Sequence, residues 1–397
     1  MVTLVLFIAL LATAMGQSVV MAILPSLGRE AGLSELQVAT VLSSSALIFA
    51  IGTTRWSSYA ARAGNRRTLL FGLGGYTLGT FCFATVFWLG LQHSLTGYAL
   101  FACLLIARMA QSSIMSATPP AALGYIMGYA RARELHLVAS LSRVTSANNL
   151  GQVLGPGMAG LLVVFGLVAP LYAIILLTCL ALLLVWFKLP EESSSSVVDV
   201  SNDSHTVPAA ILPTIPLMMF AVVIFTCLAM LQQTLGFIFI DHFGLAPVGA
   251  AQASGSAMMC CALAALTVQW TIVQKSRLEL LPSLMVAAML MTTGYSVITV
   301  ATSLYAVYAG MAAIGCGLGI GYPSVTASAT QHCLPEKRAK ITGLMTATPP
   351  IGYTAGPPAA ALLYQVDFHL PLIVCAVLSG FLFIVPARLS RFRFAKK

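Results

Sequence analysis

Apolar stretches of about 20 residues recur from one end of this sequence to the other. A helix of that length crosses the hydrocarbon core of a bilayer, where a helix satisfies all of its own backbone hydrogen bonds. Hydrophobic residues make up 59% of the chain and charged residues only 8%, which is too few charges to cover a water-soluble protein of 397 residues. The sequence therefore predicts an all-α polytopic membrane protein. The first stretch, residues 1–24, lacks the basic start of a signal peptide and is taken as the first span.

Twelve transmembrane helices are predicted, and one long polar segment divides them into two sets of six. That segment, residues 189–213, contains a run of four serines and lacks apolar periodicity, as a flexible linker does. The predicted domains are an N-terminal six-helix bundle (1–188), the linker (189–213) and a C-terminal six-helix bundle (214–397). The predicted spans are 3–24, 36–57, 68–90, 97–120, 136–164, 168–188, 214–240, 247–272, 280–301, 304–328, 341–364 and 370–389.

The net charge of +9 reflects orientation in a membrane rather than nucleic-acid binding. Lysine and arginine gather on alternate loops, whereas the other loops hold Arg29 and otherwise acidic residues and histidines. Cytoplasmic loops carry such an excess of lysine and arginine. We therefore expect an inner (cytoplasmic) membrane protein whose two termini and linker lie in the cytoplasm.

The chain offers no recognisable catalytic, metal or cofactor motif. Its nine cysteines lie mostly inside apolar stretches and form no CxxC pair or metal-ligand spacing. No nucleophile elbow, zinc-protease motif or pair of carboxylates within one span is present. We expect no disulfide, metal site or cofactor, and an enzymatic activity has no support.

One charge stands out within the apolar stretches. Arg108 lies near the middle of the stretch 98–117, and no aspartate or glutamate lies inside any comparable stretch. A charge at membrane depth costs several kcal/mol and usually marks a functional site. Gln111 follows after about one helical turn, so both side chains share a face and could line one cavity. The alternative is an arginine satisfied by backbone carbonyls between helices.

The two halves repeat one motif at a constant offset. Gly151, Gly155 and Pro156 in the fifth span correspond to Gly352, Gly356 and Pro357 in the eleventh. Small residues at every fourth position let two helices approach closely, and proline bends a helix. Such repeats predict two pseudo-symmetric bundles around a central site, with transport by rocking of one bundle against the other. We expect these six residues, together with Gly160, to act in gating.

With this layout, the chain resembles the major facilitator superfamily, and within it the twelve-span drug/proton antiporter branch. The segment Gly151-Gln-Val-Leu-Gly155-Pro156-Gly157-Met-Ala-Gly160 resembles the fifth-span signature of that branch, whose members are mostly exporters. The segment Arg108-Met-Ala-Gln111-Ser112 resembles the fourth-span motif whose arginine is implicated in proton coupling, with Ser112 in place of the usual glycine.

A third resemblance concerns the loop between spans two and three. Residues 57–67 resemble the family's cytoplasmic gate loop, in which Arg62, Gly64, Arg66 and Arg67 match, whereas Ala61 replaces the aspartate. The resemblance implies a gate that would have to work without that carboxylate. The alternative is a basic turn that only sets topology.

Several uncharged polar or aromatic residues within spans are further candidates for substrate binding. Each amide would prefer a partner across a helix interface, so packing and cavity lining are both open. A glycine-rich run, residues 315–321, is a weak match to a nucleotide loop and fits a closely packed helix better. The candidates are Gln17, Asn148, Asn149, Gln232, Gln233 and Tyr322.

The leading hypothesis is a proton-coupled secondary active exporter that works as a monomer by alternating access. A cavity that contains Arg108 without a carboxylate favours an anionic or neutral polar solute, such as a carboxylate-rich, siderophore-like metabolite. Because arginine does not release a proton, the proton would travel on the substrate, on Asp241 or on a histidine at a span end. Broad multidrug efflux is the alternative, and a channel or a non-transporting receptor is a further class. The expected partners are a small molecule, protons and the lipid bilayer.

Overall fold

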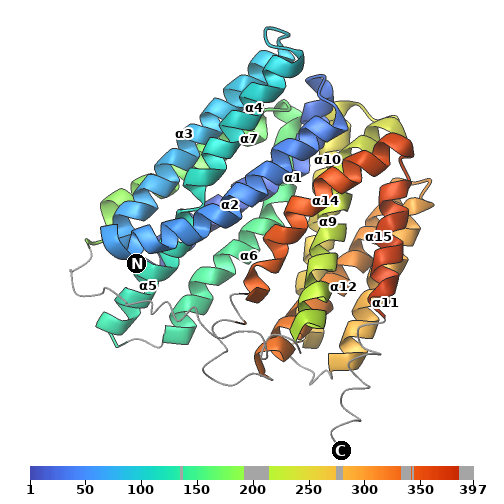
Figure 1. Cartoon of the computed structure of the whole chain (residues 1–397). Helices are drawn as coiled ribbons and strands as arrows, with labels where there is room; N and C mark the ends of the chain where they lie inside the picture. Colours follow the sequence, from blue (N-terminus) through green and yellow to red (C-terminus); the bar gives the residue numbers. More distant parts are fainter. Residues whose placement is uncertain (135–136, 192–213, 274–279, 332–340, 342–343, 384–397) are drawn as a thin grey trace, which may run out of the picture. The chain divides into compact units, whose positions relative to one another are not determined.

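The computed structural model consists mainly of helices joined by short loops in its described part, which comprises residues 1–134, 137–191, 214–273, 280–331, 341 and 344–383 (Figure 1). A 3₁₀ turn (Val163–Phe165) follows α6, and a π-helical turn (Gln269–Val273) follows α10. The predicted all-α membrane fold is confirmed. The α-helices are α1 (Val2–Glu30), α2 (Glu35–Ala63), α3 (Asn65–Leu91), α4 (Gly97–Met115), α5 (Thr118–Ala132), α6 (Leu137–Leu162), α7 (Ala169–Lys188), α9 (Ile215–Asp241), α10 (Pro247–Val268), α11 (Leu280–Thr299), α12 (Leu304–Gln331), α14 (Thr348–Val366) and α15 (Leu370–Phe381).

Within the described ranges, nine helical segments are long and apolar enough to cross a membrane, with α4 and α5 counted as one. The helices follow the predicted spans closely, and the main difference concerns the fourth span. It was predicted to end at residue 120, but α5 begins at Thr118 and continues to Ala132. Pro119 and Pro120 explain this difference, because prolines in the first turn of a helix start a new helix rather than end one.

The chain forms two compact units. Unit 1 comprises Met1–Asn202 and Phe239–Ser256, and unit 2 comprises Asp203–Ile238 and Ala257–Lys397. The C-terminal end of α9 and the first part of α10 therefore belong to unit 1. Residues 192–213, which make up most of the predicted linker, and residues 384–397 lie outside the described residues, so the predicted domain boundaries stay predictions.

In unit 1, α6 packs against α1 through the predicted glycines. A Cβ atom added to Gly151 would lie 2.7 Å from Ala14 Cβ, and one added to Gly155 would lie 2.7 Å from Ser18 Cβ and 2.8 Å from Met15 O. Only glycine permits so close an approach of the two backbones.

Unit 2 repeats this contact between α14 and α9. A Cβ atom on Gly352 would lie 2.6 Å from Phe225 Cβ, and one on Gly356 would lie 2.7 Å from Ala229 Cβ and 2.8 Å from Thr226 O. The partners on α9 stand at a constant sequence offset from those on α1. The repeat predicted from the Gly-Pro motifs is thus present as one equivalent helix contact in each unit.

The glycine-rich run of the tenth predicted span lies inside α12. Gly319 faces α10, where an added Cβ atom would lie 2.6 Å from Ala265 O. Gly317 faces α11, where an added Cβ atom would lie 2.8 Å from Ala287 O. These glycines serve close helix packing, as the preferred interpretation of the run expected.

Candidate functional site

Arg108 of α4 lies fully buried in unit 1 and takes part in a polar chain that joins α4 to α3. Its side chain is 0% exposed, and its Nη1 donates to Gln111 Oε1 at 2.6 Å. Gln111 Nε2 then donates to Thr80 Oγ1 at 2.7 Å. The predicted common face of Arg108 and Gln111 is therefore observed, and it points toward α3.

The rest of the guanidinium has no polar partner among the described residues. Arg108 Nε and Nη2 are buried without a hydrogen bond, and none of the ion pairs in the described part of the chain includes Arg108. The Phe83 ring lies 5.7 Å from Arg108 Cζ and is a weak cation–π partner. Among the described residues, no backbone carbonyl accepts a hydrogen bond from Arg108. Each unpaired buried donor costs about 1–3 kcal/mol, so the arrangement calls for a ligand.

Tyr76 belongs to the same region and was missed by the sequence reasoning. It is 0% exposed, and its hydroxyl is buried without a hydrogen-bond partner among the described residues. It lies close to Gly16 of α1, where an added Cβ atom would clash with the phenol. The spacing of Tyr76, Thr80 and Phe83 places them on one face of α3, which is the signal that could have revealed the set.

The other predicted binding residues of unit 1 stand apart from this chain of hydrogen bonds. Gln17 and Asn148 are half-buried and Asn149 is exposed. The single hydrogen bond of Arg108 within the described residues goes to Gln111, so none of these three amides is hydrogen-bonded to the guanidinium.

The remaining predicted binding residues belong to unit 2. Gln233 is buried, and Gln232 and Tyr322 are half-buried. The Tyr322 ring meets the Phe225 ring edge-on, with 4.9 Å between ring centroids. The Tyr353 ring is tilted against the Phe225 ring, with 6.4 Å between their centroids. Tyr322 is thus part of an aromatic cluster of α9, α12 and α14.

The predicted gate loop holds the end of α7 within unit 1. Arg66 Nε donates to Leu189 O at 2.7 Å, and Nη2 donates to Trp186 O at 2.9 Å. These carbonyls belong to the last turn of α7 and its C-cap, which a cation stabilises. Gly64 joins α2 to α3 with a φ of +93°.

The flanking arginines of this loop contribute less. Arg62 Nε donates to Ser58 O at 3.3 Å, within its own helix, and Arg67 is exposed. The observed role of the loop is therefore to anchor α7, and its gating role stays a prediction.

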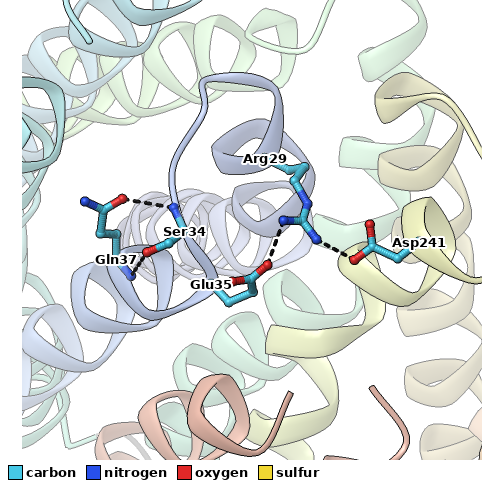
Figure 2. Close-up of polar contacts among 5 residues, drawn as sticks. All are labelled: Arg29, Ser34, Glu35, Gln37 and Asp241. Atoms are coloured by element: carbon cyan, nitrogen blue, oxygen red, sulfur yellow. Dashed lines mark hydrogen bonds and ion pairs between the residues drawn. The ribbon is translucent and has the colours of Figure 1, made fainter. Parts of the chain in front are cut away.

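Arg29, at the end of α1, bridges two carboxylates (Figure 2). Its Nη1 donates to Glu35 Oε1 at 2.6 Å, and its Nη2 pairs with Asp241 Oδ2. Glu35 is the first residue of α2, whose start is held by a capping box between Ser34 and Gln37. Arg29 thereby ties the end of α9 to the α1–α2 turn. The predicted coupling residue Asp241 lies in this ion pair.

Gly160 of α6 packs closely against Gly255 in the first part of α10. A Cβ atom on Gly160 would lie 3.1 Å from Gln252 O, and one on Gly255 would lie 2.8 Å from Gly160 N. Pro156 lies inside α6, one turn before Gly160. In this structure the predicted gating glycines of α6 are thus helix-contact positions of unit 1.

Comparison with known proteins places this arrangement in a family. The family profile described as Major Facilitator Superfamily matches residues 6–348 and, in a second match, residues 276–393. A sequence comparison with curated proteins gave no match.

Solved structures share the fold over nearly the whole chain. A crystal structure of a variant of the nucleoside transporter NupG is similar with a TM-score of 0.75 at 13% identity, covering 98% of this chain and 100% of that one. A bacterial homolog of the human lysosomal transporter Spinster gives 0.73 at 14% identity, with coverages of 98% and 96%. A bacterial homologue of the iron transporter ferroportin gives 0.71 at 16% identity, with coverages of 98% and 98%. At these identities the likeness shows the fold alone. The family profile, which matches most of the sequence, shows that the chain belongs to the Major Facilitator Superfamily of multi-pass membrane transporters.

Proposed function

We propose that this protein is a proton-coupled secondary active exporter of a small organic anion, with a carboxylate-rich, siderophore-like metabolite as the most concrete candidate. The observation that carries the proposal is the fully buried Arg108, whose one hydrogen-bond partner among the described residues is the neutral Gln111. An arginine keeps its charge in any protein environment, so its burial must be compensated by something else.

The charge argument separates anions from cations. A buried ion without a counter-charge is strongly unfavourable, and an anionic substrate group would relieve that cost on binding. A lipophilic cation would increase the cost of the buried charge. The sequence places no carboxylate inside a predicted span that could reverse this preference.

Export and proton coupling rest on the resemblance of Gly151 to Gly160, and of Arg108 with Gln111, to the drug/proton antiporter branch. Arginine cannot release the proton, so Asp241 or the substrate itself would carry it. Asp241 in turn pairs with Arg29, so a proton on Asp241 would weaken that ion pair. In this proposal the protein works as a monomer in the inner membrane, with both termini in the cytoplasm.

Broad multidrug efflux is the second candidate. The cluster of Phe225, Tyr322 and Tyr353 in unit 2 supports it, because aromatic faces suit hydrophobic drugs and cations. A channel would carry flux without counterflow, and a receptor would bind its ligand without flux.

The metabolites released by cells that lack the gene, compared with those of the parent cells, identify the substrate. In proteoliposomes that contain the full chain, citrate should be moved against its gradient when a proton gradient is imposed, and the movement should stop when the gradient collapses. Arg108→Gln should abolish this transport, whereas the matched change Arg143→Gln, at an exposed arginine of α6, should preserve it. Transport of tetraphenylphosphonium that is unaffected by Arg108→Gln would refute the charge argument and favour the multidrug alternative.

A further inference from the structure

Three buried donor groups of unit 1 have no hydrogen-bond partner among the described residues. Two are the Nε–H and an Nη2–H of Arg108, and the third is the Tyr76 hydroxyl. Both residues are 0% exposed, and Tyr76 lies one helical turn before Thr80, which accepts a hydrogen bond from Gln111, the partner of Arg108. Unpaired buried donors are rare in folded proteins, and several together point to a missing acceptor.

The polar chain between α3 and α4 holds Arg108 in one orientation. Thr80 Oγ1 donates to Tyr76 O at 2.7 Å and accepts from Gln111, whose Oε1 accepts from Arg108 Nη1. Gly79 makes the close approach of the helices possible, because an added Cβ atom would lie 2.8 Å from Gln111 Cβ. The one side-chain acceptor that Arg108 meets among the described residues, Gln111 Oε1, is therefore already used.

The free atoms of Arg108 have the geometry that a carboxylate requires. The Nε–H bond and one Nη2–H bond leave the same edge of the planar guanidinium in parallel, which is the fork that binds both oxygens of one carboxylate. In the proposed site the Tyr76 hydroxyl would add a third hydrogen bond to one of those oxygens. Since all three groups donate, the site suits an ionised carboxylate better than an alcohol, amide or amine.

We infer that Tyr76 and Arg108 together form a buried oxyanion site that binds a carboxylate group of the transported solute. This inference rests on the proposed function and adds to it a second binding residue and the group recognised. Because both side chains are fully buried, an anion reaches them when the packed helices move apart. α1 meets the Tyr76 phenol at Gly16, which has no side chain.

A matched control exists in unit 2. Tyr295 is also 0% exposed with a hydroxyl that lacks a partner among the described residues. The groups that act on it electrostatically are Cys227, Cys375, Cys261 and Tyr353, and none of them is a cation. Tyr295 therefore shares the burial of Tyr76 but lacks the arginine.

The test measures thermal unfolding of the purified full chain in detergent, by tryptophan fluorescence, with benzoate or citrate titrated against chloride at equal ionic strength. Both carboxylates should raise the melting temperature of the wild type, and chloride should not. Tyr76→Phe should weaken benzoate and citrate binding by about ten- to a hundred-fold, the value of one hydrogen bond to a charged group. Without anion it should melt at or above the wild-type temperature, because an unsatisfied hydroxyl is removed.

The remaining variants separate the possible failures. Tyr295→Phe should bind both carboxylates as the wild type does. If Arg108→Gln loses carboxylate binding while Tyr76→Phe keeps it, the role of Tyr76 is wrong and the proposed anion transport stands. If neither carboxylate stabilises the wild type, or Arg108→Gln binds them unchanged, both ideas fail. A Tyr76→Phe variant that melts well below Tyr295→Phe without anion would mean that the hydroxyl serves the fold.

Discussion

Gly155→Ala and Gly356→Ala should destabilise the protein by similar amounts, because the two positions make equivalent contacts. A Cβ atom at Gly155 would lie 2.7 Å from Ser18 Cβ, and one at Gly356 would lie 2.7 Å from Ala229 Cβ. Ordinary contacts of a Cβ atom begin at 3.4 Å. Both new methyl groups would also meet a backbone carbonyl at 2.8 Å, which no side-chain rotation can relieve.

The magnitude follows from two opposing effects. Overpacking of a closely packed contact costs about 1–3 kcal/mol, since the neighbouring helix must move away. Alanine is favoured over glycine inside a helix by about 0.5–1 kcal/mol. The net loss in the free energy of unfolding should therefore be about 0–2.5 kcal/mol for each variant. Gly74→Ala in α3 is the matched control, because its nearest atom would be Leu182 Cδ2 at 3.8 Å, and it should be neutral or stabilising.

The assay is unfolding of the full chain in detergent, followed by tryptophan fluorescence. If Gly155→Ala is as stable as Gly74→Ala, the close approach of α1 and α6 is wrong. If Gly155→Ala and Gly356→Ala differ by more than about 2 kcal/mol, beyond the usual spread of such overpacking costs, the two contacts are not equivalent.

Two further predictions concern the ends of helices. Arg29→Gln and Asp241→Asn should each cost about 1 kcal/mol or less, because their side chains are 32% and 36% exposed. In a double-mutant cycle, the double variant should lose no more unfolding free energy than the less stable single variant. If the losses of the two single variants add up in the double variant, the two side chains do not pair directly. Gly64→Ala should lower stability by about 1–3 kcal/mol, because its φ of +93° is strained for any side chain. Thermal unfolding beside Gly74→Ala measures this, and an unchanged melting temperature would be inconsistent with that backbone conformation.

Patterns within one helix carried most of what could be predicted. The helical period placed Arg108 and Gln111 on one face, and their hydrogen bond confirms it. The repeated Gly-Pro motif predicted equivalent close contacts in the two halves, and the glycines of α6 and α14 make them. The end of the fourth span was predicted wrongly at residue 120, because Pro119 lies in the first turn of α5 and a proline can begin a helix as well as end one.

Contacts between helices could not be read in the same way. Thr80 and Tyr76 lie on α3, and the sequences of α3 and α4 do not indicate which faces of these two helices pack together. The same holds for Arg66, whose partners Trp186 and Leu189 lie more than a hundred residues further along the chain.

Membrane insertion and helical structure follow from the amino-acid composition, because a bilayer makes the same local demand on every span: about 20 apolar residues and internally satisfied backbone groups. The isolated charge of Arg108 could be recognised in the same way, since no carboxylate accompanies it in any span. The pairing of Arg29 with Asp241 and the grouping of Tyr76 with Arg108 needed the tertiary structure. The partner of a polar side chain depends on which helix faces pack together, and that depends on contacts across the whole bundle rather than on neighbours in sequence.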